Sequence, residues 1–342
     1  MRAVEIAEDR SLRVTELEER ALAPGEARVR VAYCGICGSD LHLRPSPAVP
    51  AGTIMGHEFS GTIGELGPDV EGFAVGDRVT VYPFAPCGEC SSCLRGDEHV
   101  CIAAATSGLG LGANPGGYAE SVVVEASMLV PLPEELRLDH AALVEPLAVG
   151  LHGVEIGEAR PGERCVVIGA GPIGIMTAHA LRARGVEHVV SIEKNDQRRE
   201  RMRSLGFDSL PLEGVHEAIL TAFEGELPDV VFECAGNAAA PQLAIELVRH
   251  RGIIVLLGVL EEPVSISQLV LMIKEAQLRA SFAYRREDFD EAIELLVTGK
   301  VSGERLVTAT APLASAQSMF ERLEDPSTDD IKILLSPASD SS

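Results

Sequence analysis

Alternating hydrophobic and polar residues predict short β-strands in the first 150 residues of the chain. The alternation is clearest at residues 27–32, which read ARVRVA, and comparable runs follow at 60–66, 77–82 and 118–124. Glycine and proline separate these runs, and no helical period appears before Leu136. Successive side chains of a strand point to opposite faces, so this pattern is typical of strands with one buried face. It predicts an irregular β domain whose loops carry the function.

Beyond residue 160 the pattern changes to apolar strands that alternate with helices. Residues 164–168 read RCVVI, residues 173–184 have a helical period that ends at Gly185, and 188–192 form the next strand. Alternating strands and helices predict a doubly wound α/β domain with a parallel sheet. The further predicted elements are strands at 229–236 and 252–259, an amphipathic helix at 288–299, a last strand at 331–335 and a frayed tail at 336–342.

Composition and charge restrict the class of protein. A chain of 342 residues is expected to form two domains, and the absence of Trp leaves a mainly aliphatic core. The net charge of −23 argues against nucleic-acid and anionic-membrane partners, because phosphate groups are bound by clustered Lys and Arg. Neither a signal peptide nor an apolar run of roughly 18 residues is present. The eight cysteines do not suit a disulfide framework in a chain of this length, so we expect a cytoplasmic, metal-binding protein.

The densest group of chemically capable residues is the run CGICGSDLH at residues 34–42, followed by GHE at 56–58. Zinc binds Cys, His and carboxylate ligands, and a catalytic zinc site leaves one position open. We therefore predict a zinc site that activates an alcohol. Two alternatives are a redox dithiol formed by Cys34 and Cys37, and an ordinary partly buried histidine at His57.

Glu145 is a single carboxylate in the apolar helical run AALVEPLAV, residues 141–149. Such a residue can be a plain solvated position. Beside Cys37 and His57 it becomes a candidate zinc ligand, or a group that supports a ligand.

Four cysteines with the spacing C-x2-C-x2-C-x7-C predict a structural zinc site. They are Cys87, Cys90, Cys93 and Cys101, in a lobe at about 86–102 that has too little apolar content to fold by burial. Four thiolates close a tetrahedral zinc site with no open position. The alternatives are four unrelated surface thiols and an iron–sulfur cluster. Zinc is favoured, because the bacterial ferredoxin run ends in Cys-Pro after a shorter last gap.

A dinucleotide-binding fingerprint follows the strand at 164–168. Glycines at 169, 171 and 174 form G-x-G-x-x-G, with Pro172 and Ile173 inside it, and the next strand ends in Glu193. The glycines allow the tight turn and the close approach of the pyrophosphate, and the acid binds the adenosine ribose. Glu193 predicts NAD, because its charge repels the additional phosphate of NADP, whereas Lys194 and Arg198 nearby weaken this preference.

Two later strands also end near glycines, where the carboxyl ends of parallel strands meet a ligand. We assign to the cofactor site Gly169, Gly171, Pro172, Ile173, Gly174, Glu193, Arg198, Cys234, Ala235, Gly258 and Val259. Cys165 and Cys234 are most simply small strand residues.

These motifs, in this order, resemble the zinc-dependent medium-chain dehydrogenase/reductase (alcohol dehydrogenase) family over almost the whole chain. The EPLAV run resembles the branch that contains sorbitol, butanediol, threonine and glucose dehydrogenases. The resemblance implies a GroES-like domain formed by residues 1–150 and 286–342, with a Rossmann NAD-binding domain at 151–285. It also implies a homodimer or homotetramer and two zinc ions per chain.

The resemblance further implies that Cys37, His57, and Glu58 or Glu145 hold the catalytic zinc. The expected reaction transfers hydride between a secondary alcohol, polyol or sugar and NAD, with zinc acting as a Lewis acid that forms the alkoxide. Ser39 would take the alcohol proton and His42 would carry it to solvent. Asp40 is expected to orient a zinc-bound histidine.

Two other readings belong to different classes. The chain can be a catalytically silent binding or structural relative, similar to the lens-crystallin-like members of the family, or a zinc-free reductase. The retained Cys37, GHE and EP motifs favour the zinc enzyme.

Overall fold

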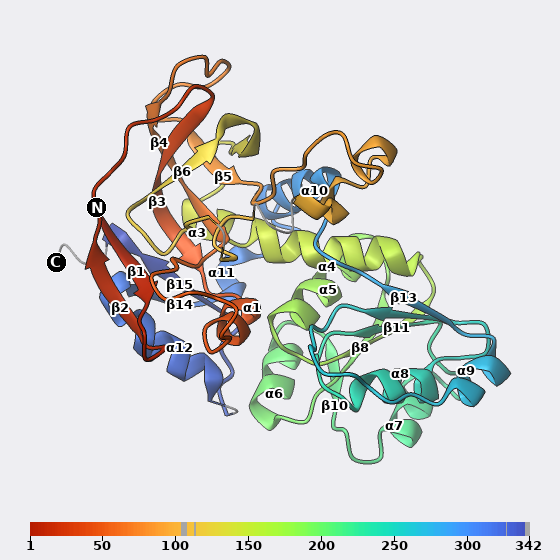
Figure 1. Ribbon diagram of the computed structural model, residues 1–342. Helices are drawn as coiled ribbons and strands as arrows, with labels where there is room; N and C mark the ends of the chain where they lie inside the picture. Colours follow the sequence, from red (N-terminus) through yellow and green to blue (C-terminus); the bar gives the residue numbers. More distant parts are fainter. Residues whose placement is uncertain (104–107, 113, 326, 339–342) are drawn as a thin grey trace. The chain divides into compact units, whose positions relative to one another are not determined.

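The protein is described from a computed structural model, in which residues 1–103, 108–112, 114–325 and 327–338 are placed (Figure 1). The chain divides into two compact units. The first comprises Met1–Glu145, Arg285–Asp325 and Lys332–Ser342, and the second comprises Pro146–Tyr284 and Pro326–Ile331. Of the predicted tail, residues 339–342 lie outside the described part of the chain, and Ser336 ends a strand.

The first unit is built on a seven-stranded sheet with the order β14-β15-β3-β4-β5-β7, and β6 pairs with β3 (Figure 1). All of its pairings except β14 with β15 are antiparallel. A separate hairpin is formed by β1 (Arg2–Ile6) and β2 (Leu12–Glu16). The sheet strands are β3 (Glu26–Gly35), β4 (Glu58–Leu66), β5 (Arg78–Val81), β6 (Ser121–Glu125), β7 (Leu129–Pro131), β14 (Val307–Pro312) and β15 (Lys332–Ser336).

Short helices connect these strands. They are α1 (Gly38–Leu43), α3 (Leu138–Ala141), α10 (Arg286–Val297), α11 (Gly303–Leu306) and α12 (Ala316–Glu324), with 3-10 turns η1 (Cys93–Arg95), η2 (Glu98–Val100), η3 (Ala126–Met128) and η4 (Leu313–Ser315).

The longest strand, β3, shows why the alternating pattern forms this sheet. Ala27, Val29 and Val31 are buried in the aliphatic core, as the alternation at 27–32 predicts. The strand continues to Gly35, which pairs with Glu58, so β3 and β4 bring residues 34–37 beside residues 57–58. The register of this antiparallel strand pair therefore brings together the two segments that carry the predicted metal ligands.

The second unit is a parallel six-stranded sheet with the order β10-β9-β8-β11-β12-β13 and connecting helices (Figure 1). This confirms the predicted doubly wound α/β fold. Its strands are β8 (Arg164–Ile168), β9 (His188–Ile192), β10 (Asp208–Leu210), β11 (Val230–Glu233), β12 (Ile253–Leu256) and β13 (Gln277–Ala280). The helices are α5 (Pro172–Ala183), α6 (Asp196–Ser204), α7 (Val215–Ala222), α8 (Ala240–Leu247) and α9 (Gln268–Lys274), and α4 (Val144–Gly157) begins two residues before this unit.

The sequence shows no helical period before Leu136, but the structure has the 3-10 turns η1, η2 and η3 and the α-helix α1 in this region. Residues 38–43 form helix α1, which begins where the Cys37 backbone N–H donates to the Asp40 carboxylate at 3.0 Å. A helix of six residues is too short to show a hydrophobic period, and a side-chain cap at its first turn stabilises it instead.

Candidate active site and cofactor site

Cys37, His57 and Glu58 form the first potential metal site, within the first unit. Cys37 immediately precedes α1, and His57 and Glu58 lie at the start of β4. One ligand atom from each side chain lies within 4.8 Å of the other two. Cys34 belongs to the hydrophobic core instead, and burial raises the pKa of its thiol well above the ordinary value. Such a thiol is inert, which argues against the dithiol alternative.

Three buried polar atoms around this cluster have no hydrogen-bond partner among the residues that the structure describes. They are Ser39 Oγ, Asp40 Oδ1 and His57 Nδ1. The last two face each other across 3.7 Å. Unpaired buried polar atoms are costly in a folded protein, so their grouping here points to a missing ligand. A metal-bound His donates its other ring N–H to a carboxylate, and Asp40 is the carboxylate that faces Nδ1 of His57. The residues therefore fit a zinc ion.

The charge around His57 is strongly negative. Burial by itself would lower the pKa of His57. The charges of Cys37 and Asp40 nevertheless raise this pKa well above its ordinary value, and Glu145 adds to the effect. Glu145 is buried in the first turn of α4 and lies outside the close set of three ligand atoms. This electrostatic environment favours a cation.

Lys332 is a site residue that the sequence analysis missed. Its Nζ lies 2.6 Å from both carboxylate oxygens of Glu58 and donates to the Ile36 carbonyl at 3.1 Å. Burial opposes the charge, but Glu58 and Cys37 raise the pKa of Lys332. The signal in the sequence was the single lysine in the apolar run IKILL at residues 331–335.

Ser39 and His42 both lie on α1, three positions apart. The Ser39 side chain is partly buried, whereas His42 is exposed in the last turn of the helix. The two predicted relay residues thus occupy the inner and the solvent-exposed parts of the same short helix.

The four lobe cysteines form a second potential metal site in the first unit. The Sγ–Sγ separations are 3.9 Å for Cys87–Cys93, 3.5 Å for Cys90–Cys93, 3.8 Å for Cys90–Cys101 and 3.5 Å for Cys87–Cys101. Four sulfurs at about 2.3 Å from one zinc lie about 3.8 Å apart in a tetrahedron. The cysteines are free thiols, and their geometry fits zinc.

In the second unit, the glycine-rich turn links β8 to α5. Gly169 follows the strand with φ +98°, and a Cβ on Gly174 would lie 1.9 Å from the Gly169 carbonyl oxygen. Gly171 precedes Pro172, the first residue of α5, and Ile173 follows in its first turn. The turn therefore needs glycine at both 169 and 174, which leaves backbone amides beside the helix N-terminus, where phosphate groups bind.

Glu193 follows β9 and contacts this turn directly. One of its carboxylate oxygens accepts from the Ala170 N–H and the other from the Asn195 N–H, both at 2.9 Å. Each oxygen retains a second lone pair, so the carboxylate can still accept from ribose hydroxyls. Arg198 lies on α6, and its Nε donates to the Thr328 carbonyl at 3.0 Å.

The other predicted cofactor residues follow neighbouring parallel strands. Cys234 and Ala235 come directly after β11, and Gly258 and Val259 come just after β12. Because these strands pair in parallel, their carboxyl ends lie at the same sheet edge as the end of β8. This is the edge at which doubly wound folds bind ligands.

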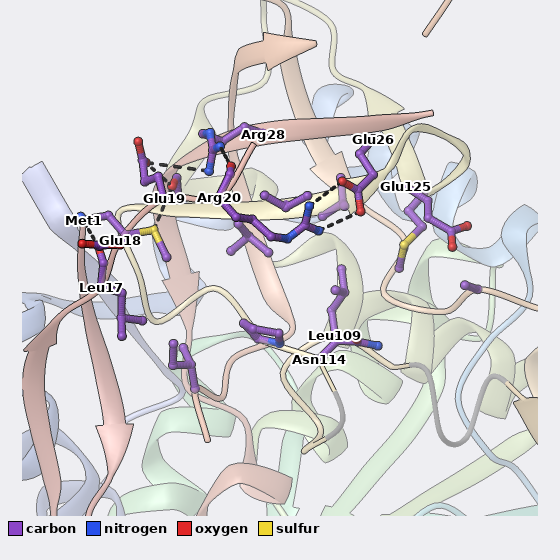
Figure 2. A pocket seen from close by; sticks show the side chains of 18 residues that line it. Met1, Leu17, Glu18, Glu19, Arg20, Glu26, Arg28, Leu109, Asn114 and Glu125 are labelled. Carbon is purple, nitrogen blue, oxygen red and sulfur yellow. Dashed lines mark hydrogen bonds and ion pairs between the residues drawn. The ribbon is translucent and has the colours of Figure 1, made fainter. Parts of the chain in front are cut away.

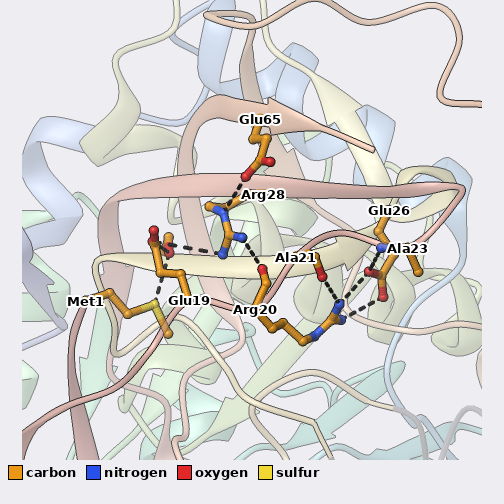
Figure 3. Close-up of polar contacts among 9 residues, drawn as sticks. Met1, Glu19, Arg20, Ala21, Ala23, Glu26, Arg28 and Glu65 are labelled. Atoms are coloured by element: carbon orange, nitrogen blue, oxygen red, sulfur yellow. Dashed lines mark hydrogen bonds and ion pairs between the residues drawn. The ribbon is translucent and has the colours of Figure 1, made fainter. Parts of the chain in front are cut away.

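A cavity of about 410 Å³ lies elsewhere in the first unit (Figure 2). Its two arginines are paired with carboxylates, as Figure 3 shows: Arg20 with both oxygens of Glu26 at 2.7 Å, and Arg28 with Glu65 at 3.0 Å. No predicted site residue is among the described residues that line it, so the cavity is separate from the potential metal sites.

Comparison with known proteins identifies the family. Residues 23–134 match the alcohol dehydrogenase GroES-like domain, and residues 172–298 match the zinc-binding dehydrogenase family. A 2-dehydro-3-deoxy-L-galactonate 5-dehydrogenase from Pseudoalteromonas atlantica is 36% identical over 90% of this chain and 91% of its own.

Solved structures agree with these sequence matches. The crystal structure of 2R,3R-butanediol dehydrogenase from Bacillus subtilis has a TM-score of 0.89 and 30% identity, covering 98% of this chain and 99% of that one. A zinc-binding dehydrogenase from Sinorhizobium meliloti, bound to NADP, has a TM-score of 0.89 and 28% identity with the same coverage.

The chain belongs to the zinc-dependent medium-chain dehydrogenase/reductase family of alcohol and polyol dehydrogenases. It is an α/β oxidoreductase with GroES-like and Rossmann-type domains, as the motifs predict. Membership implies zinc and NAD(P), and the four-cysteine cluster fits a structural zinc. Within the described residues, no helix is both long and apolar enough to cross a membrane.

Proposed function

We propose that this protein is an NAD-dependent zinc dehydrogenase that oxidises a secondary alcohol, a polyol or a sugar acid. The observation that carries the proposal is the cluster of unpartnered buried atoms, Ser39 Oγ, Asp40 Oδ1 and His57 Nδ1, around the potential zinc ligands. Relatives of 32–36% identity are named as dehydrogenases of butanediol, of sorbitol and of 2-dehydro-3-deoxy-L-galactonate, which supports this substrate class.

Cys37, His57 and Glu58 would hold the catalytic zinc, with Glu145 as the alternative carboxylate. Bound zinc would supply a Lewis acid that polarises the alcohol oxygen, and NAD would accept the hydride. The Ser39 hydroxyl has no hydrogen-bond partner within the described part of the chain and is available for the alcohol proton. His42 is exposed on the same helix and can release that proton to solvent.

We propose that the enzyme prefers NAD to NADP because of the carboxylate of Glu193. This carboxylate is fixed beside the glycine-rich turn by the Ala170 and Asn195 amides. A fixed negative charge at this position binds ribose hydroxyls and repels a 2′-phosphate.

Zinc analysis and a substrate panel test the proposal together. The purified protein should contain two zinc ions per chain and should form NADH from members of a panel of secondary alcohols, polyols and sugar acids. Cys37→Ser should abolish turnover and retain the fold and the structural zinc. Cys93→Ser is the matched substitution in the other site, and it should mainly lower thermal stability. One zinc per chain without turnover would instead support the silent or zinc-free relatives.

A homo-oligomer is also proposed, from an apolar surface on the second unit. Leu269, Met272 and Ile273 on α9 are more than 60% exposed, and Leu278 of the edge strand β13 and Phe282 just after it are exposed nearby in sequence. Exposed apolar residues mark a protein interface where they form one patch, and we propose that these residues form such a patch.

A further inference from the structure

Tyr118 is a fully buried tyrosine whose hydroxyl reaches the group that orients His57. It lies three residues before β6, and its hydroxyl donates to Asp40 Oδ2 at 2.6 Å. Neither Tyr118 nor Asp40 has any measurable exposure to solvent. Burial and the Asp40 charge raise the pKa of Tyr118 well above its ordinary value, so the hydroxyl keeps its proton and remains a donor.

The two oxygens of Asp40 have different surroundings. Oδ2 accepts from the Tyr118 hydroxyl and from the Cys37 backbone N–H at 3.0 Å. Oδ1 has no hydrogen-bond partner among the described residues and faces His57 Nδ1 across 3.7 Å. Two donors on one oxygen fix the plane of the carboxylate, and the other oxygen is thereby aimed at the histidine.

We infer that Tyr118 is a positioning residue of the zinc site, which fixes Asp40 so that His57 presents Nε2 to the metal. This inference rests on the proposed zinc site. Asp40 Oδ1 faces His57 Nδ1 across 3.7 Å, and a proton on Nδ1 directed at this carboxylate would leave the Nε2 lone pair free for zinc.

The tyrosine ring has a separate packing role, which the test must leave intact. It packs edge-on against Phe320 with 5.9 Å between centroids. It also fills the space beside Gly56, where a Cβ would lie 2.7 Å from the ring. Tyr118→Phe keeps these contacts and removes only the hydroxyl.

The experiment measures zinc affinity at each site by competition with a chromogenic chelator. Loss of a group that orients a ligand typically weakens metal binding about 10-fold to 100-fold, and we expect about tenfold for this more remote group. The four-cysteine site is an internal reference, and its affinity should not change in Tyr118→Phe. In protein with cobalt(II) at the catalytic site, the d–d absorption should shift, because the His57 ring is held less firmly. Tyr33→Phe is the control, since Tyr33 is a partly exposed residue of β3.

A double-mutant cycle distinguishes positioning from packing. If Tyr118 acts through Asp40, Tyr118→Phe should have almost no effect on zinc affinity in an Asp40→Asn background. Additive effects, an unchanged affinity in the single variant, or equal weakening of both sites would overturn the inference. Absence of a second zinc in the unmodified protein would instead refute the proposed function, so the two failures are distinguishable.

Discussion

At the scale of single residues, the pair of Lys332 and Glu58 shows how this site tolerates several carboxylates. Both side chains are almost completely buried and lie 2.6 Å apart. The lysine compensates a negative charge beside Cys37, so the site does not accumulate uncompensated charge. Each Glu58 oxygen has a lone pair that the ammonium does not use, so the pair is compatible with metal binding.

Replacing only Lys332 should destabilise the protein more than replacing both members of the pair. Lys332→Met leaves a buried carboxylate uncompensated, which costs about 3–5 kcal/mol. Urea denaturation of protein that carries only the structural zinc measures this loss, because no metal then compensates Glu58. In the matched double variant, Lys332→Met with Glu58→Gln, part of the stability should return. A single variant as stable as the unmodified protein would show that the pair contributes nothing.

Glu193 is the residue that should set the cofactor preference. We expect catalytic efficiency with NAD to exceed that with NADP by at least about tenfold, which corresponds to roughly 1.4 kcal/mol. Glu193→Ser should narrow this ratio, because the repulsion of the 2′-phosphate is removed. Steady-state kinetics with both cofactors gives the ratio, and equal efficiencies in the unmodified enzyme would contradict the assignment.

His42 should affect the reaction without affecting the metal. His42→Gln should slow alcohol oxidation most below neutral pH, where hydroxide cannot replace the imidazole. General-base groups typically contribute about a hundredfold, and access of water to this exposed position can reduce the loss. Stopped-flow NADH formation across pH, with zinc content as control, is the measurement. Superimposable pH profiles would exclude His42 from the proton path.

At the scale of elements, Asp229 joins the starts of two neighbouring parallel strands. It immediately precedes β11, and its carboxylate accepts from the Arg164 N–H at 2.8 Å and from Arg249 Nε at 2.6 Å. Burial opposes ionisation, but these donors hold the pKa of Asp229 below its ordinary value. A carboxylate with a lowered pKa stabilises the fold when it is ionised.

Asp229→Asn should therefore destabilise the fold in a pH-dependent way. The loss should be about 1.5–3 kcal/mol at pH 7, as for hydrogen bonds to a charged group. It should be complete above the unfolded-state pKa of about 4 and should shrink as the pH falls towards the lower, folded-state pKa. Urea denaturation of both proteins at pH 7 and at about pH 3.5 gives the two differences. A loss that is equal at both pH values would show that the charge is not involved.

At the scale of the whole molecule, the proposed homo-oligomer depends on the exposed apolar residues of helix α9 and the edge strand β13. Ile273→Glu should shift the molar mass, measured by light scattering after gel filtration, from an oligomer towards the monomer. Leu212→Glu is the matched control, because Leu212 is 50% exposed and follows β10 at the opposite edge of the same sheet. An oligomer that persists in Ile273→Glu, or a monomeric unmodified protein, would refute this interface.

The sequence by itself determined the features that depend on local spacing. Each of these features can be read within about a dozen residues. They are the C-x2-C-x2-C spacing of the lobe cysteines, the glycines at 169, 171 and 174, and the alternation over residues 27–32. Local geometry restricts such segments directly, so the fold class and the lobe cysteines were predictable. The short helix α1 was not, because six residues carry too little periodicity.

Only the tertiary structure decided which distant residues complete the site. Lys332 is 274 positions from Glu58 in the chain, and Tyr118 is 78 positions from Asp40. Their partners are set by the pairing of β15 with β3 and by the packing of the core. Neither leaves a periodic trace in the sequence, because a single buried lysine or tyrosine is chosen by the shape and charge of a space that exists only after the sheet has formed.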